Sequence, residues 1–219
     1  MLHVFVETNW VVDYAAPVHY RAPAAVRLLD RTRAGELRLH LPSICLSEAR
    51  RPILTKHQSR HTDTVRQFLK WAKPRGLVNT EDGLATGRVL DLLEQQVRTD
   101  LSELDQTLVN LAQDRALDVF PLDGSMLERV ASLSFEKLDL HPFDHAVLAA
   151  VLVRAEMLRS EGETEVVFCE LDSDLQPWDR QRRRKDPLAA LYDAAGVWVY
   201  GDFVLKAPER PAGWAGAVP

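Results

Sequence analysis

The segment LHVFVETN, residues 2–9, gives the first indication of the fold. Residues 2–6 form a short run of aliphatic, aromatic and β-branched side chains, which is typical of a buried strand. An acid, Glu7, follows that strand at once, and two small polar residues, Thr8 and Asn9, come next. Two interpretations of Glu7 stay open: it caps a helix that begins near Asn9, or it belongs to a group of carboxylates at a functional site.

Further segments along the chain resemble this first strand, and helical segments separate them. Strands are expected over residues 37–41, 117–121, 166–169 and 197–200. Helices are expected over residues 21–33, from 43 onward, and over 124–133, 143–158 and 188–195. The helix over 143–158 is apolar on most of its faces, which indicates burial. This alternation predicts an α/β domain with a parallel sheet of about five strands covered by helices on both faces.

A long helical stretch interrupts the alternation between residues 57 and 116. It has no strand signal, and it breaks at Lys73-Pro74-Arg75-Gly76 and more loosely around Gly83. We therefore expect two or three helices folded back as a hairpin inside a single domain that spans residues 1–206. Residues 207–219 are rich in Pro, Gly and Ala and are expected to form a loose tail.

The composition is that of a soluble globular protein of 219 residues, with 46% hydrophobic and 27% charged residues. No apolar run is long enough to cross a membrane, and the N-terminus lacks the pattern of a signal peptide. Cys45 and Cys169 lie far apart and no C-x-x-C pair occurs, so neither a zinc site nor a disulfide framework is indicated. We expect a cytoplasmic protein without membrane partners.

Basic residues are clustered although the net charge is −5. Residues 49–75 contain eight Lys or Arg and one acid, whereas residues 91–118 contain seven acids and two Arg. A second basic run covers residues 180–185. Such clusters are either solvated surfaces or binding sites for an anionic partner. The candidates for nucleic-acid binding are Arg50, Arg51, Lys56, Arg60, Arg182 and Arg183.

Acids occur where a parallel sheet places its ligand site, beyond the carboxyl ends of the strands. Besides Glu7, these acids are Glu48 near the start of a helix, Asp144 in the first turn of the apolar helix, and Asp172 and Asp174 after the fourth strand. Each has a simpler explanation, such as an ion pair, a favourable helix-end charge or a turn. Several carboxylates in one cleft repel one another, and Mg²⁺ or Mn²⁺ with oxygen ligands would relieve that repulsion.

The histidines are a weaker source of ligands. His57 and His61 lie four residues apart on a helix, but the Glu of an H-E-x-x-H zinc motif is missing, so both are expected at the surface. His145 follows Asp144 directly and is expected to point to a different side of its helix, so it is assigned no metal role.

Four motifs in this order resemble those of PIN-domain nucleases. They are VFVETN at 4–9, LPSICLSEA at 41–49, HPFDHAVLAAVL at 141–152 and VVFCELDSDL at 166–175. The likeness is greatest to bacterial PIN-like proteins that begin with a strand and E-T-N, relatives of the VapC-type toxins, and it covers about residues 1–206. Glu7 stands where most PIN domains have Asp.

This resemblance implies a metal-dependent endoribonuclease. Glu7, Glu48, Asp144 and either Asp172 or Asp174 would be the catalytic acids around Mg²⁺ or Mn²⁺, with Glu7, Asp144 and Asp172 as metal ligands. Thr8 or Asn9 would help to orient water or ligand. It also implies RNA as substrate, a homodimer and, for a toxin, an antitoxin protein as partner. The alternatives are a non-catalytic PIN-like module that binds RNA or protein, and a phosphatase suggested by Asp172-x-Asp174.

Overall fold

The computed structural model of the chain describes residues 1–57, 62–136 and 138–205. It confirms the expected α/β fold, with a five-stranded sheet in which all neighbouring strands are parallel. The strand order is β3-β2-β1-β4-β5. The strands are β1 (Leu2–Phe5), β2 (Leu37–Pro42), β3 (Leu117–Phe120), β4 (Val166–Cys169) and β5 (Val197–Tyr200).

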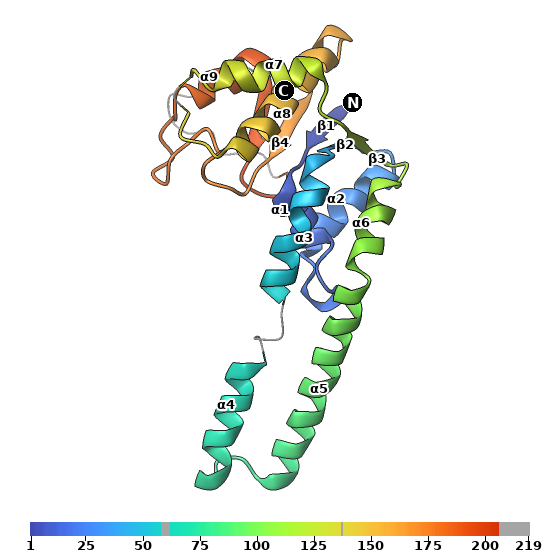
Figure 1. Cartoon of the computed structure of the whole chain (residues 1–219), viewed down its shortest axis with the longest axis vertical. Coiled ribbons are helices and arrows are strands. Elements are labelled where there is room, and N and C mark those ends of the chain that lie inside the picture. The colour runs from blue at the N-terminus through green and yellow to red at the C-terminus, as the bar shows by residue number, and fades with distance from the viewer. Residues whose placement is uncertain (58–61, 137, 206–219) are drawn as a thin grey trace.

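The helices form two groups on opposite sides of the sheet (Figure 1). The first group is α1 (Thr8–Tyr14), α2 (Pro23–Arg33), α3 (Ile44–His57) and α6 (Leu104–Ala112), with the short 3₁₀ helix η1 (Val18–Tyr20) between α1 and α2. The second group is α7 (Gly124–Leu133), α8 (Pro142–Ser160) and α9 (Leu188–Ala195). The second helix begins at Pro23, two residues after the predicted start at Arg21, because proline at the first helical position fixes a helical φ.

The chain order reverses at the centre of the sheet, between β1 and β4. From β1 the chain proceeds outward to β2 and β3, and it then returns to place β4 on the other side of β1. In the register of these strands, Phe5 lies beside His40 of β2 and beside Phe168 of β4. A crevice is expected beyond the carboxyl ends of the strands at such a reversal, so the fold itself points to the end of β1.

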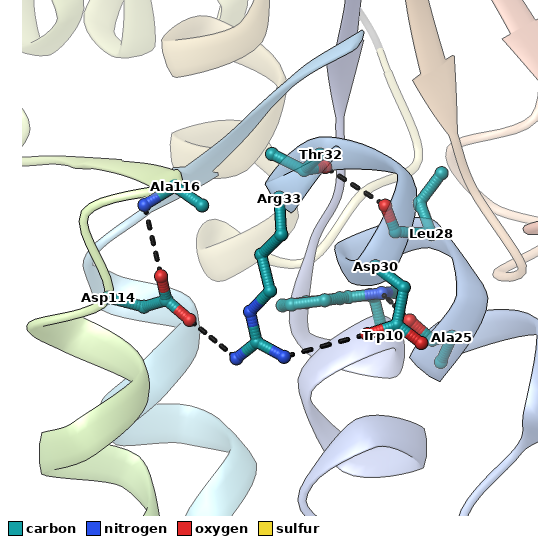
Figure 2. A network of polar contacts seen from close by, with 8 residues as sticks. All are labelled: Trp10, Ala25, Leu28, Asp30, Thr32, Arg33, Asp114 and Ala116. Atoms are coloured by element: carbon teal, nitrogen blue, oxygen red, sulfur yellow. Dashed lines mark hydrogen bonds and ion pairs between the residues drawn. The ribbon is translucent and has the colours of Figure 1, made fainter. Parts of the chain in front are cut away.

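Burial of α8 and α1 fixes the two walls of that crevice. The middle of α8, residues 147–152, is completely enclosed, as its apolar sequence predicts. Trp10 of α1 is fully buried, and its indole nitrogen donates a hydrogen bond to the carbonyl of Ala25 in α2 at 3.2 Å (Figure 2). The end of α2 is held in turn by Arg33, which contacts Asp114 at 2.7 Å.

A helical hairpin projects away from this body (Figure 1). It consists of α4 (Asp63–Ala72), the short 3₁₀ helix η3 (Lys73–Arg75) and α5 (Thr80–Ser102). Arg66 of α4 joins the two arms through ion pairs with Asp91 and Glu94 of α5. The expected break at Gly83 is wrong. Asn79 caps α5, and Gly83 lies within its first turns, against the side chain of Lys73.

Two further expectations concern side chains outside the crevice. His57 is buried against Tyr20, with ring centroids 5.3 Å apart, so the prediction that it lies at the surface is wrong. His61 and the tail 207–219 lie outside the described residues.

Cys45 and Cys169 are both buried and unbridged. Among the helices that the structure describes, none is long and apolar enough to cross a membrane.

Candidate active site

A pocket of about 290 Å³ lies at the reversal of the chain order, beyond the carboxyl end of β1. Four of the predicted acids line this pocket, and they come from segments far apart in the sequence. Its polar lining comprises Glu7, Thr8, Asn9, Glu48, Lys56, Asp144 and Asp172. The apolar lining comprises Val12, Pro52, Phe143, Val147 and Leu175. The structure thus brings Glu7, Glu48, Asp144 and Asp172 together, as the sequence predicted.

The two oxygens of the Glu7 carboxyl group differ in their contacts. Its Oε2 accepts a hydrogen bond from the backbone nitrogen of Asn9 at 2.8 Å and so caps α1. Its Oε1 is buried without a hydrogen-bond partner among the described residues. An unsatisfied buried carboxylate oxygen is costly in free energy, so this atom is available to a ligand that enters the pocket.

Glu48 and Asp144 form the two sides of the pocket. Glu48 lies one turn into α3, and its Oε2 accepts a hydrogen bond from the hydroxyl of Thr8. Within the described residues, Glu48 forms no ion pair with Arg51, which had been the simpler explanation of its position. Asp144 lies in the first turn of α8. The free backbone N–H groups at the N-terminus of that helix favour a negative charge there.

Asp172 and Asp174 face different cavities. Asp172 lines the pocket that contains Glu7, whereas Asp174 lines a neighbouring pocket. A turn holds the two apart: the backbone nitrogen of Asp174 donates to the carboxylate of Asp172 at 2.9 Å. Of the two acids, Asp172 is therefore the one that lines the same pocket as Glu7.

Sequence reasoning missed a fifth acid, Glu170. It directly follows β4, is completely buried, and its Oε2 has no hydrogen-bond partner among the described residues. Because Phe5 and Phe168 are paired across β1 and β4, the acids two residues further along, Glu7 and Glu170, come side by side. That common spacing from the paired strands was the available signal. The other oxygen of Glu170 accepts from the backbone nitrogen of Asp172 and so supports the turn.

Burial and, to a smaller extent, neighbouring acids raise the pKa of four carboxyl groups at this edge of the sheet. Burial, followed by repulsion from Glu48 and Asp172, raises the pKa of Glu7 from 4.5 to about 8. Burial and the neighbouring Glu7 raise the pKa of Glu170 well above its ordinary value. The pKa of Glu48 and of Asp144 is also raised, mainly by burial and then by nearby carboxylates. Positive charge in the pocket would stabilise the ionised forms of all of them.

The side chains at the pocket carry the type of ligand atom that a hard divalent cation prefers. All of the acidic groups offer oxygen, which Mg²⁺ and Mn²⁺ prefer, and two buried oxygens, on Glu7 and Glu170, lack partners among the described residues. In the described part of the chain, however, no three of these side chains are already gathered as a preformed ligand cluster. The carboxylates surround the pocket and would have to move inward to bind an ion.

The predicted nucleic-acid-binding residues are dispersed. Lys56 lines the pocket and contacts Asp13 at 3.2 Å. Arg50 is paired with Asp105 at 2.6 Å on the outer side of α3, and Arg51 is exposed on the same helix. Arg60 lies outside the described residues. Arg182 lines the neighbouring pocket together with Asp174, whereas Arg183 is paired with Asp179 at 2.6 Å.

Comparison of the chain with protein-family models, with characterised proteins and with solved structures gives no match.

Proposed function

We propose that the protein is a metal-dependent endoribonuclease of the PIN-like type. The observation that carries this proposal is the buried, unpartnered Oε1 of Glu7, which lies in a pocket lined by three further carboxylates at the reversal of a parallel sheet. An acidic cluster alone would be weak support. A buried carboxylate whose pKa is raised to about 8 is a group that a cation would stabilise strongly.

Glu7, Asp144 and Asp172 are the residues that would hold Mg²⁺ or Mn²⁺, with Glu48 beside them. When bound, such an ion polarises a phosphoryl oxygen and lowers the pKa of an attacking water. The chain's own groups have distinct parts in this arrangement. Glu48 fixes the Thr8 hydroxyl that faces the pocket, and Lys56 supplies a positive charge at the pocket for the substrate's phosphate.

Cleavage of RNA tests this proposal. The purified chain should hydrolyse an unstructured single-stranded RNA in the presence of Mn²⁺ or Mg²⁺, and EDTA should stop the reaction. Asp144→Asn should abolish most of the activity, because the amide cannot supply the negative charge. Unchanged cleavage by Asp144→Asn would show that the assigned pocket is not the catalytic centre.

The second candidate is a non-catalytic PIN-like module, and the exposed face of the hairpin favours it. Large apolar side chains project from both arms: Val65, Phe68 and Trp71 on α4, and Leu84, Val89 and Leu92 on α5. Monomeric proteins rarely expose so many neighbouring apolar groups without a partner. A calorimetric titration separates the two candidates, since no binding of Mn²⁺ at millimolar concentration would favour the module.

We further propose a second copy of the chain as the partner of this hairpin. Arg66, Asp91 and Glu94 pair with one another within the hairpin. The rest of the arm 63–75 has three basic residues and one acid, whereas the rest of α5 has three acids and two Arg. A two-fold axis parallel to the hairpin would place α4 of each copy on α5 of the other, with opposite charges facing each other. Because α5 is about 35 Å long, the hairpin offers an extended surface for such a contact.

A role as a toxin, with an antitoxin protein as inhibitor, is a narrower version of the nuclease proposal. It rests on the resemblance of the VFVETN motif to VapC-type proteins. It predicts that a small DNA-binding protein encoded immediately upstream binds the chain and blocks RNA cleavage in the cytoplasm.

A further inference from the structure

A second pocket, of about 510 Å³, lies next to the carboxylate pocket. A single turn separates the two: Asp172 and Leu175 line the first pocket, whereas Ser173, Asp174 and Gln176 line the second. The volume of the second pocket is within the range of small-ligand sites. Whatever occupies it would therefore be adjacent to the candidate metal site.

The second pocket is positively charged, although the chain as a whole is acidic. Arg180, Arg182 and Lys185 line it together with Asp174 and Asp179. Asp179 is neutralised by Arg183, which contacts it at 2.6 Å. Among the described residues, neither Arg180 nor Arg182 forms an ion pair. The pocket thus has a surplus of positive charge suited to phosphate.

A small loop, held by internal hydrogen bonds, positions these cations. Trp178 and Arg184 form an antiparallel bridge, and the carboxylate of Asp179 accepts hydrogen bonds from the backbone nitrogens of residues 181 and 183. At the loop, Arg182 has a φ of 62°, a conformation that non-glycine residues adopt only when the surroundings enforce it. The guanidinium of Arg182 is thereby held over the indole of Trp178, 5.3 Å from the ring centroid.

The Lys185 side chain closes the side of the pocket nearest the catalytic acids. Its ammonium group donates hydrogen bonds to the backbone carbonyls of Ser173 at 2.9 Å and of Asp174 at 3.0 Å. These contacts place a positive charge directly on the turn that separates the two pockets.

We infer that this second pocket binds one nucleotide of single-stranded RNA beside the phosphodiester that is cleaved. The base stacks on the outer face of the Arg182 guanidinium, whose inner face lies on Trp178, and the nucleotide's phosphate lies near Arg180 and Lys185. Stacking of unpaired bases on arginine planes and aromatic rings is a common mode of RNA recognition. This inference rests on the proposed nuclease function for its substrate, but it concerns binding and is testable without catalysis.

The test compares two arginines that differ in their surroundings. Binding of a short, fluorescently labelled, unstructured RNA to the full chain is measured by fluorescence anisotropy in EDTA, so that no cleavage occurs. Arg182→Ala should weaken binding about 10-fold, as expected for loss of a stacked base. Arg27→Ala removes the same charge from an exposed position on α2 that lines neither pocket, so its effect should stay below about 2-fold.

Equal weakening by the two variants would overturn the inference, because it would show only a general effect of charge. Absence of RNA binding by the unmodified chain would overturn it as well. Circular dichroism of both variants checks that the substitutions leave the fold intact.

The failure of the nuclease proposal would look different. In that case Asp144→Asn and the unmodified chain would behave alike in Mn²⁺, while Arg182→Ala would still bind RNA more weakly than Arg27→Ala. If both proposals hold, Arg182→Ala should raise KM for a short RNA and leave kcat within about 2-fold.

Discussion

Replacement of Glu7 by Gln should stabilise the metal-free protein, and the gain should depend on pH. Glu7 has a pKa of about 8 in the folded chain and an ordinary value of 4.5. At any pH between these values the unfolded chain ionises this carboxyl group, while the folded chain keeps it protonated. Folding then requires uptake of a proton, so the carboxyl group lowers stability increasingly as the pH rises from about 4.5 to about 8.

The magnitude follows from the two pKa values. At 1.36 kcal/mol per pKa unit, the penalty is about 1 kcal/mol at pH 5 and about 4 kcal/mol at pH 7.5. Gln has the same shape, its side-chain oxygen can still accept from the nitrogen of Asn9, and it does not titrate. The cost of burying the amide group does not depend on pH. The difference in unfolding free energy between variant and wild type should therefore grow by about 3 kcal/mol from pH 5 to pH 7.5.

Urea unfolding in EDTA at the two pH values measures this difference directly. Asn9→Ala, which leaves Glu7 and its backbone hydrogen bond in place, serves as a control whose effect should change little with pH. A difference for Glu7→Gln that stays constant within about 0.5 kcal/mol between pH 5 and pH 7.5 would refute the assignment of Glu7 as a buried acid with a raised pKa. Saturating Mn²⁺ should reverse the order of stability, because binding to the native state favours the wild type.

Three other predictions concern regions outside the pocket. Hydrogen bonding from His40, together with Arg154, lowers the pKa of Asp118 to about 2. Its carboxylate therefore stabilises the fold above about pH 4 and loses this effect as the pH falls toward 2. After allowance for its partial exposure, Asp118→Asn should cost about 1 kcal/mol at pH 7, and thermal melts at pH 7 and pH 2.5 should show the gap closing. Leu148→Ala in the enclosed part of α8 should cost about 2–5 kcal/mol in urea unfolding, and a loss below 1 kcal/mol would contradict the packing. Phe68→Ser on the exposed hairpin should shift the chain from dimer to monomer in sedimentation velocity, whereas Leu127→Ser, an exposed residue of α7, should not; a monomeric wild type would refute the proposed interface.

The sheet and the positions of four acids could be predicted because both depend on local patterns. Short apolar runs marked the strands, and in a parallel sheet any acid that directly follows a strand lies at the same edge as the others. Glu7 was found in this way, and Asp172 because it lies shortly after the fourth strand. Glu48 and Asp144 were found because they lie near the starts of helices. Asp174 shared the same signal, but it faces the second pocket because of the turn between it and Asp172.

Features that depend on contacts between distant residues were not visible in the sequence. Glu170 directly follows β4, so its place at this edge could have been predicted, but its proximity to Glu7 follows from the pairing of Phe5 with Phe168, which a single sequence does not reveal. The basic residues of 49–75 could be a solvated surface or a binding site, and the sequence does not reveal that Arg50 is paired with Asp105, 55 residues away. Gly83 was expected to break a helix, but the cap at Asn79 and the hydrogen bonds of α5 outweigh the low helix propensity of one glycine.

We propose that the carboxylates around Glu7 hold a divalent cation that the chain uses to cleave RNA. The test is the initial rate of cleavage of an unstructured RNA, measured across a range of Mn²⁺ concentrations. We predict a rate that rises with Mn²⁺ and saturates for the wild type and for Asp139→Asn, an exposed acid just before α8. For Asp144→Asn we predict a rate at least about 100-fold lower. Equal rates for Asp144→Asn and Asp139→Asn, or cleavage that does not depend on Mn²⁺, would contradict the claim.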